Sequence, residues 1–497
     1  MLENEQFLED YDVLGGSDDN LGEECGVFGI YNNDNNDSGQ ICYYALFALQ
    51  HRGQQSCGIA VTDDTTVKQY KDMGIIPEVF DDKEIVEKLT GKIAVGHVRY
   101  SAFGDSFRQN AQPLVSRYIK GTLSISHNGK LVNATELREQ LEKEGMIFQT
   151  TIDSEIVAAL IAKERIKCAS IEDAVCNMME YIKGAYTFVI MSPKKLIGCR
   201  DPHGIRPLCI GKLENSYVIS SESCAIEAIG GKFIRDVEPG EVVVIDENGL
   251  RSIKKHCNKV PSSLCIFEHI YFARPDSFID GVSVYESRKE AGRQLAKQHP
   301  VEGDLVFGVP DSGLDAAIGY AEESGIPFGL GLVKNRYIGR TFIKPTQSER
   351  EDSVRVKLNA IRASVEGKRV IMIDDSIVRG TTVARLVKIL KSAGAKEVHM
   401  RVCSPPFMHL CYYGTDIPSK DKLIANRYPL DKIAEVIGVD SLGFLSTDSL
   451  KEIVKGSKLG FCDACFTGKY PTDIPKCVEN QESDQPEIAK SANFTLL

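Results

Sequence analysis

The chain has 497 residues, more than one hydrophobic core usually organises, so we expect two domains. Its 42% apolar and 26% charged residues are typical of a globular protein, and its formal net charge of −11 disfavours non-specific nucleic-acid binding. No stretch approaches the roughly 18 consecutive apolar residues of a membrane span, and residues 1–24 are acidic and lack the apolar core of a signal peptide. We therefore expect a cytoplasmic protein that contacts neither nucleic acid nor membrane.

The first domain, residues 25–255, is predicted to be α+β. Short strand candidates such as GVFGIY, GTLSISHNG and EVVVID alternate with turn residues, as in an antiparallel sheet. Helical patterns cover 133–145 and a second stretch that begins at Asp153, which we expect to cap its helix. This pattern predicts helices packed on antiparallel sheets.

The second domain, residues 256–477, is predicted to be α/β. From about residue 300, strand-like runs that end in Gly/Ser loops alternate with helical patterns, which indicates a parallel sheet flanked by helices. Gly394 is the expected C′ residue of one such helix. The apolar face of that helix carries Val383, Leu386, Val387 and Leu390. Residues 478–497 are polar and form a tail.

The strongest local pattern is VIMIDDSIVRGTT at 370–382. Its apolar run ends in Asp374 and Asp375, at the carboxyl end of a predicted parallel strand, where open α/β sheets bind ligands. The loop that follows offers backbone N–H groups, hydroxyls and a helix N-terminus, which together cradle a phosphate. Two carboxylates beside an anion also need ribose hydroxyls or Mg²⁺ as partners. The alternative is an acidic helix cap in a domain that binds no nucleotide.

This string resembles the phosphoribosyl-pyrophosphate (PRPP) signature of type I phosphoribosyltransferases. VPDSG at 309–313 resembles their pyrophosphate loop, and the basic segment 334–344 resembles their flexible loop that closes over PRPP, although a solvated basic loop is the alternative. The resemblance implies displacement of pyrophosphate at the ribose C1 carbon, with Mg²⁺ held by Ser312, Asp374 and Asp375. It implies PRPP contacts from Asp374, Asp375, Ser376, Arg379, Gly380, Thr381, Thr382, Lys334, Arg336 and Tyr337.

Cys25 follows the acidic leader in EECGVFGI. If residues 1–24 are a propeptide that is removed, Cys25 gains a free α-amine with a pKa near neutrality, and this amine can act as general base for the thiol. A cysteine after an acidic stretch is weak evidence alone. Most of the 15 cysteines stand in apolar runs and are expected to be small buried side chains.

Four strings follow this cysteine in order: QHRGQQSCGIA, GHVRYSAFG, SHNGKLVN and TTIDSEI. Together they resemble the N-terminal-nucleophile (class II, αββα) glutamine amidotransferase domain. The resemblance implies that the cysteine is the nucleophile, that Arg99 clamps the glutamine α-carboxylate, and that Asp153 binds the α-ammonium. Asn128, through its side chain, and Gly129, through its backbone N–H, are expected to form the oxyanion hole. Arg52 is expected to support the glutamine-binding site rather than to take part in the chemistry.

A class II glutaminase followed by a type I phosphoribosyltransferase resembles the amidophosphoribosyltransferase family, over residues 25 to about 470. The resemblance implies conversion of glutamine, PRPP and water into 5-phosphoribosylamine, glutamate and pyrophosphate, the committed step of de novo purine nucleotide synthesis, with ammonia passed internally. It also implies feedback inhibition by purine nucleotides and a homotetramer. Two alternatives remain: hexosamine-phosphate synthase would need sugar-isomerase domains instead of the 370–382 string, and a PRPP-sensing regulator would need no glutaminase.

Cys462 and Cys465 form a C-x-x-C motif, which is ambiguous among a zinc site, a redox pair and an iron–sulfur cluster. Cys265 and Cys411 are distant in sequence, and spacing alone cannot join them to this motif. One branch of the amidophosphoribosyltransferase family carries both a propeptide and a [4Fe–4S] cluster on four cysteines in these contexts. The resemblance therefore implies that all four thiolates are cluster ligands, although a Cys₄ zinc site is chemically acceptable.

Overall fold

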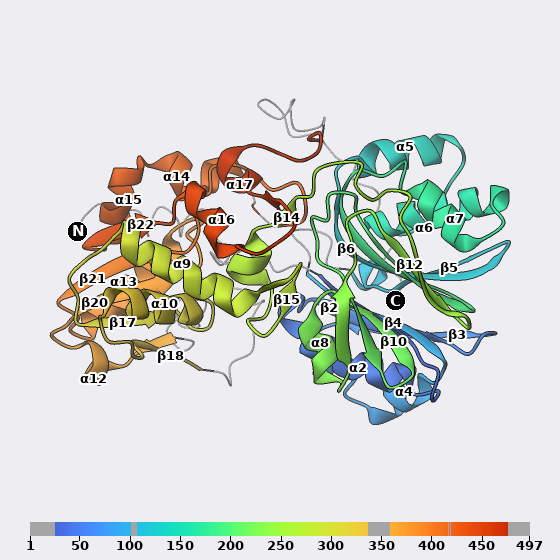
Figure 1. Cartoon of the computed structure of the whole chain (residues 1–497), viewed down its shortest axis with the longest axis horizontal. Helices are drawn as coiled ribbons and strands as arrows, with labels where there is room; N and C mark the ends of the chain where they lie inside the picture. The colour runs from blue at the N-terminus through green and yellow to red at the C-terminus, as the bar shows by residue number, and fades with distance from the viewer. Residues whose placement is uncertain (1–24, 101–106, 336–357, 416, 418, 476–497) are drawn as a thin grey trace.

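The computed structural model describes residues 25–100, 107–335, 358–415, 417 and 419–475. They form two lobes (Figure 1), with the N-terminal lobe coloured blue to green and the C-terminal lobe yellow to red. The N-terminal lobe contains two antiparallel sheets and the C-terminal lobe a parallel sheet, which confirms the predicted α+β then α/β fold. Within the described residues, the helices are too short or too polar to cross a membrane.

The first sheet of the N-terminal lobe carries the segment that starts at Cys25. Its strand order is β11 (Lys232–Asp236), β9 (Cys209–Leu213), β10 (Ser216–Ser220), β1 (Gly26–Tyr31), β4 (Ile93–Arg99), β2 (Ser56–Thr62) and β3 (Val67–Met73). Helices α2 (Ser38–Ala48) and α8 (Ser223–Ala228) pack on it. Successive side chains of β1 point to opposite faces of the sheet and enter two different cores. Phe28 packs in the core that contains Leu46 of α2, and Val27 packs in the core that contains Val189 of the second sheet.

The second sheet carries the predicted oxyanion-hole residues. Its order is β13 (Gly249–Ile253), β12 (Val242–Asp246), β8 (Lys195–Arg200), β7 (Gly184–Ser192), β6 (Gly121–Leu131) and β5 (Leu114–Tyr118). Helices α5 (Ala134–Lys143), α6 (Asp153–Lys167) and α7 (Ile171–Met178) accompany this sheet and contribute to its outer core. The two sheets approach closely at Gly29, where a Cβ would overlap the side chain of Val189. The result is an αββα sandwich, as the resemblance implied.

One local prediction is wrong, and one helix was not predicted. Asp153 does not cap its helix: it is the first residue of α6, Ile152 precedes it without a side-chain cap, and the Asp153 carboxylate accepts a hydrogen bond from Leu131 N instead. Helix α2 was not predicted, because its large apolar side chains do not gather on one face. Leu46 is buried, whereas Tyr44 and Phe47 are 55% and 52% exposed, so the one-sided periodicity of a surface helix is missing.

The C-terminal lobe is built on the four parallel strands β17 (Leu305–Gly308), β20 (Arg369–Asp374), β21 (Glu397–Val402) and β22 (Ser441–Phe444). Alternate residues of β20 enter two cores. Ile371 and Ile373 face the layer of α9 (Val284–Gln298) and α10 (Leu314–Ser324), and Val370 and Met372 face that of α13 (Thr381–Ser392) and α15 (Leu430–Ile437). The predicted apolar face of α13 is buried, and Gly394 follows its end with φ +94°.

A junction segment joins the lobes. It comprises β14 (Leu264–Cys265), the π-helix η3 (Glu268–Phe272) and the hairpin of β15 (Phe278–Ile279) and β16 (Val282–Ser283), which leads into α9. β14 pairs in parallel with β23 (Phe461–Cys462), near the end of the described chain, and α17 (Ala464–Thr467) follows. The junction therefore contacts both the first helix of the C-terminal lobe, α9, and its last strand, β23.

Candidate active sites

Cys25 lies directly before β1, at the end of the first sheet where β4 finishes. Gly26 pairs with Val98 in the antiparallel register, which brings Cys25 beside Arg99, the last residue of β4. The partly exposed Cys25 thiol donates to the carbonyl oxygen of Tyr100 at 3.5 Å. Arg99 is buried. The fold thus places the predicted nucleophile next to the predicted carboxylate clamp.

Two histidines join these strands to the second sheet. The Nε2 of His97 in β4 lies 2.8 Å from the carbonyl oxygen of His127 in β6, so the strand that ends at Arg99 meets the strand that carries Asn128. Burial lowers the pKa of His97 to about 3 and that of His127 to about 4. Both rings are therefore neutral at pH 7 and serve as packing and hydrogen-bonding groups.

The predicted oxyanion-hole residues are buried in β6. Both polar side-chain atoms of Asn128 are enclosed without a hydrogen-bond partner among the described residues. A buried amide of this kind costs free energy, and such a group in a site is free to bind a ligand oxygen. Gly129 has φ +131°, and a Cβ there would overlap the carbonyl of Ala185, so only glycine fits.

Asp153 and Arg52 are each held by other protein groups. Oδ2 of Asp153 accepts from Leu131 N at 2.9 Å, and Oδ1 lies 3.7 Å from Lys130 Nζ, so β6 orients this carboxylate. Arg52 ends the 3₁₀ turn η1 (Gln50–Arg52), and its Nε donates to the carbonyl oxygen of Cys25 at 3.0 Å. Arg52 thus contacts the backbone of the predicted nucleophile.

In the C-terminal lobe the aspartate pair lies where two parallel strands end. Gly308 of β17 pairs with Ile373 of β20, which brings the 309–313 loop beside Asp374 and Asp375. Oδ1 of Asp374 accepts from Ser312 Oγ at 3.2 Å, and Oδ2 of Asp375 accepts from Ser376 Oγ at 2.5 Å. Burial first, and then the neighbouring charge of Asp375, raise the pKa of Asp374 well above its ordinary value. The pair therefore favours a cation in this site.

The other predicted PRPP residues surround this pair in part. Gly380 is the N-cap of α13, so Thr381 and Thr382 form the first turn of that helix, where backbone N–H groups point outward. Arg379 is buried. Lys334 Nζ is 2.7 Å from Oδ2 of Asp311 and so lies at the 309–313 loop. Arg336 and Tyr337 fall outside the described residues.

The four predicted cluster cysteines line one cavity. Cys265 and Cys462 are register partners of β14 and β23, while Cys411 and Cys465 come from a loop and α17. The rest of the wall is mainly apolar and aromatic, with one hydroxyl-bearing threonine: Ile205, Phe267, Phe407, Tyr413, Thr415, Ala464 and Tyr470. Burial raises the pKa of the Cys462 thiol to about 12, and the pKa of Cys465 is raised by burial and by the other three thiols. Ionised thiolates here need a positive partner.

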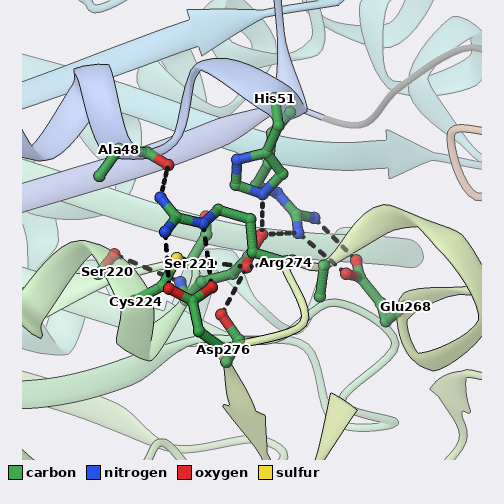
Figure 2. A network of polar contacts seen from close by, with 12 residues as sticks. Ala48, His51, Ser220, Ser221, Cys224, Glu268, Arg274 and Asp276 are labelled. Atoms are coloured by element: carbon green, nitrogen blue, oxygen red, sulfur yellow. Dashed lines mark hydrogen bonds and ion pairs between the residues drawn. The ribbon is translucent and has the colours of Figure 1, made fainter. Parts of the chain in front are cut away.

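A buried charge network between the lobes was not predicted (Figure 2). Glu222 at the start of α8 and Glu268 of η3 both contact the Arg52 guanidinium, with N–O distances of 2.7 and 2.8 Å, and all three side chains have 0% exposure. Each glutamate is an ordinary acidic residue in its own string. For Glu222 the available signal was that no Lys, Arg or His lies within nine residues of it in sequence, whereas Glu268 is followed directly by His269 and gave no such signal.

Comparisons with known proteins agree with this two-lobe organisation. Residues 97–228 match the glutamine amidotransferase domain family and residues 285–404 the phosphoribosyl transferase domain family. The chain is 50% identical to an amidophosphoribosyltransferase of Archaeoglobus fulgidus over 453 residues, covering 91% of this chain and 98% of the relative. It is 49% identical to one from Bacillus subtilis over 459 residues, covering 91% and 95%. A solved structure of the B. subtilis glutamine PRPP amidotransferase, complexed with ADP and GMP, has a TM-score of 0.85 and 48% identity over 91% of this chain and 98% of that one.

Proposed function

The chain belongs to the amidophosphoribosyltransferase family, and from this premise we propose that Cys25 releases ammonia from glutamine while Asp374 and Asp375 hold PRPP. The chain catalyses glutamine-dependent amidotransfer to PRPP in purine biosynthesis. The observation that carries the residue assignment is the placement of Cys25 beside Arg99 and of Ser312 beside Asp374, each at the end of neighbouring strands.

Ammonia release begins with attack of the Cys25 sulfur on the glutamine amide carbon. Once residues 1–24 are removed, the Cys25 α-amine takes the thiol proton and passes it to the leaving ammonia. The tetrahedral oxyanion is stabilised by the Asn128 side-chain N–H and the Gly129 backbone N–H. The partnerless amide of Asn128 supports this role. Water then hydrolyses the γ-glutamyl thioester to give glutamate.

Glutamine is oriented by its two charged α-substituents. Arg99 binds the α-carboxylate and Asp153 the α-ammonium, with Arg52 supporting the site through the Cys25 carbonyl. The hydrogen bond from Leu131 N to Oδ2 of Asp153 supports this assignment, since it fixes the carboxylate, and Oδ1 is engaged only at 3.7 Å by the Nζ of Lys130.

The phosphoribosyl site uses the strand ends of the C-terminal lobe. Asp374 and Asp375 bind the ribose hydroxyls, and the loop 376–382 binds the 5′-phosphate at the start of α13. The loop 309–313 takes the pyrophosphate, with Lys334 beside it. Ser312 and the two aspartates would hold Mg²⁺, which when bound would supply positive charge to the leaving pyrophosphate. Ammonia, passed internally from the first lobe, then forms the bond to C1 as the C1–oxygen bond to pyrophosphate breaks.

The four cysteines are proposed to hold a [4Fe–4S] cluster that ties the C-terminal segment to the junction. Within the described residues, no three histidine, cysteine, aspartate or glutamate side chains converge on a single-ion position. Four Cys thiolates in one cavity are the ligand set of a [4Fe–4S] cluster and also of a Cys₄ zinc site, and metal analysis distinguishes the two. Iron and sulfide analysis with visible absorbance tests this, and a colourless, iron-free, fully active protein would contradict it.

Regulation and assembly are also part of the proposal. A phosphoribosyl site that binds a ribose 5-phosphate group also fits purine nucleoside monophosphates, so we expect purine nucleotides to inhibit by competing with PRPP. The relative crystallised with ADP and GMP supports this class of ligand. We further propose a cytoplasmic homotetramer, which size-exclusion chromatography with light scattering tests.

The decisive experiment separates the two half-reactions. In a Cys25→Ser variant, glutamine-dependent synthesis should be lost, whereas synthesis from added ammonia and PRPP should persist because the phosphoribosyl site is intact. N-terminal sequencing of the active protein should begin at Cys25. Glutamine-dependent activity in Cys25→Ser, or a fully active chain that begins at Met1, would refute the assignment.

A further inference from the structure

The Arg52 guanidinium is enclosed by carboxylates from both lobes. Its Nη1 donates to Oε1 of Glu222 at 2.7 Å and to Oε2 of Glu268 at 2.9 Å, and its Nη2 donates to Oε1 of Glu268 at 2.8 Å. The bidentate pair with Glu268 fixes the plane of the guanidinium. In that orientation, Nε donates to the Cys25 carbonyl oxygen. Figure 2 shows Glu268 on one side of this network and His51 above it.

The two glutamates come from different parts of the chain. Glu222 belongs to the N-terminal lobe, and it also accepts from Arg274 N at 2.9 Å and Ser277 Oγ at 2.7 Å of the junction. Glu268 belongs to η3, which packs against α9 of the C-terminal lobe. Without the second lobe, Arg52 would therefore lose its bidentate partner.

A second arginine, Arg206 of the N-terminal lobe, lies at ion-pair distance from Glu268. Nη1 of Arg206 lies 3.7 Å from Oε1 of Glu268, and Nη2 of Arg206 donates to the carbonyl of Tyr413 at 2.7 Å. Both arginine side chains are completely buried, where an ion pair keeps its geometry only if its partners remain in place. Glu268 is therefore placed by η3, which packs against α9 of the C-terminal lobe, and by Arg206, whose Nη2 donates to the Tyr413 carbonyl of that lobe. Through its bidentate pair, Glu268 in turn orients Arg52.

The Cys25 carbonyl is one bond from the Cα that carries both the thiol and the α-amine. Fixing the carbonyl therefore limits rotation about that Cα and orients the nucleophile and its base together. We propose that Glu268 is a positioning residue for Cys25, acting through Arg52, so that the junction of the phosphoribosyl lobe completes the glutaminase site. This inference rests on the proposed role of Cys25 as the nucleophile. It confines efficient ammonia release to a chain in which both lobes are joined.

The test uses the full-length, processed holoenzyme with Glu268→Gln, which keeps the size and removes the charge. A matched control is Asp280→Asn, because Asp280 forms another buried bidentate pair across the junction. Its partner is Arg200, at 2.8 and 2.9 Å, and not Arg52. Glutamine-dependent kcat and KM, and ammonia-dependent synthesis, are measured for each.

For Glu268→Gln we expect the glutamine-dependent kcat to fall on the order of 10²-fold, because small misplacements of a reacting group cost about that much. The glutamine KM should change by no more than about twofold, since Arg52 holds the enzyme's backbone and not the substrate. Ammonia-dependent synthesis should remain. Asp280→Asn should lower the melting temperature and keep the glutamine-dependent kcat.

If Glu268→Gln lowers both activities in parallel, or matches Asp280→Asn, Glu268 is only a structural residue and the inference is wrong. If that variant does not fold, Glu268→Asp and Arg52→Lys replace it, and the alkylation rate of Cys25 by iodoacetamide adds a readout independent of turnover. A slower rate with retained ammonia-dependent synthesis supports positioning, and an unchanged rate refutes it. Failure of the nucleophile assignment would show differently, as retained glutamine-dependent activity in Cys25→Ser.

Discussion

The backbone N–H of Leu131 donates to Oδ2 of Asp153 at 2.9 Å, so the strand that carries Asn128 and Gly129 also fixes the carboxylate proposed to bind the glutamine ammonium. One strand thereby sets the distance between the oxyanion hole and the α-ammonium site. A glutamine side chain of fixed length can then be recognised at both ends.

Asp153→Asn tests the charge in this arrangement. The amide oxygen of Asn can still accept from Leu131, so the melting temperature should change little, but the pair with the glutamine ammonium is lost. The glutamine KM should rise about 10- to 100-fold, since hydrogen bonds to charged groups contribute about 1.5–3 kcal/mol. Steady-state kinetics with glutamine and with ammonia checks this. Glu139→Gln, an exposed residue of α5, is the control, and an unchanged KM in Asp153→Asn would exclude the ammonium role.

Asn128→Ala tests the oxyanion hole. Loss of one donor to a developing oxyanion lowers kcat by about 10²–10³-fold. Because the Asn128 amide has no hydrogen-bond partner among the described residues, its removal breaks no hydrogen bond within that part of the chain. Thr187 lies opposite Asn128 in the β6–β7 register and is also buried, so Thr187→Val is the matched control and should retain kcat. Equal losses of kcat in the two variants would indicate a packing effect.

The sequence was informative where a short string carries both the fold and the chemistry. The string at 370–382 contains a strand, a loop and a helix start, and the structure places Asp374 and Ser376 within that unit. The order of strands around Cys25 could not be predicted from the sequence pattern. Cys25 lies beside Arg99 because β1 and β4 pair over a long sequence separation, and only the family resemblance predicted that the two share a site.

Residues whose role depends on burial were not predictable. Glu222 and Glu268 meet Arg52 only because the junction folds against the N-terminal lobe, and an isolated glutamate in a sequence is far more often solvated. Spacing alone could not join Cys265 to Cys462, which are register partners in a parallel pair of two-residue strands, and only the resemblance placed them in one ligand set. Helix α2 was missed for a different reason, since its apolar side chains lie on both faces.

The raised pKa of Asp374 predicts that replacing its carboxylate stabilises the Mg²⁺-free protein but removes activity. Its pKa is raised in the folded protein without a cation, by burial first and then by Asp375. A carboxyl whose folded pKa exceeds its unfolded pKa contributes stability below the unfolded value, and this stability is lost as pH rises through the folded value. Asp374→Asn should therefore raise the melting temperature of Mg²⁺-free protein at pH 7–8, by about 2–4 °C for each kcal/mol regained.

The same variant should lose PRPP-dependent synthesis, because the amide cannot replace a carboxylate toward ribose and Mg²⁺. Differential scanning fluorimetry with chelator, repeated across pH, measures the first effect. The difference from the unsubstituted chain should shrink at low pH, where Asp374 is protonated in both states. A melting temperature that falls in Asp374→Asn at neutral pH would contradict the proposed repulsion.

Iron removal should loosen the C-terminal segment before the rest of the chain. β14 and β23 have two residues each, and short strand pairs are marginal without a further tie. The cross-link proposed here is the iron bound by the four thiolates. Without iron, the remaining contacts of this segment include hydrogen bonds from Met408 N and His409 N to the Cys465 carbonyl, each 3.0 Å. Limited proteolysis after chelation should therefore cut first within 456–475.

The paired measurement is the iron content at each time point. Cleavage should rise with iron loss, whereas the αββα sandwich should resist, because its two sheets share the core around Val27 and Val189 that contains none of these thiols. A Cys465→Ser variant should be cut at the same sites without chelation, since it removes one ligand permanently. Equal protection of 456–475 in the iron-free and iron-loaded protein would mean that strand pairing alone holds the segment, and the cluster would then have no structural role there.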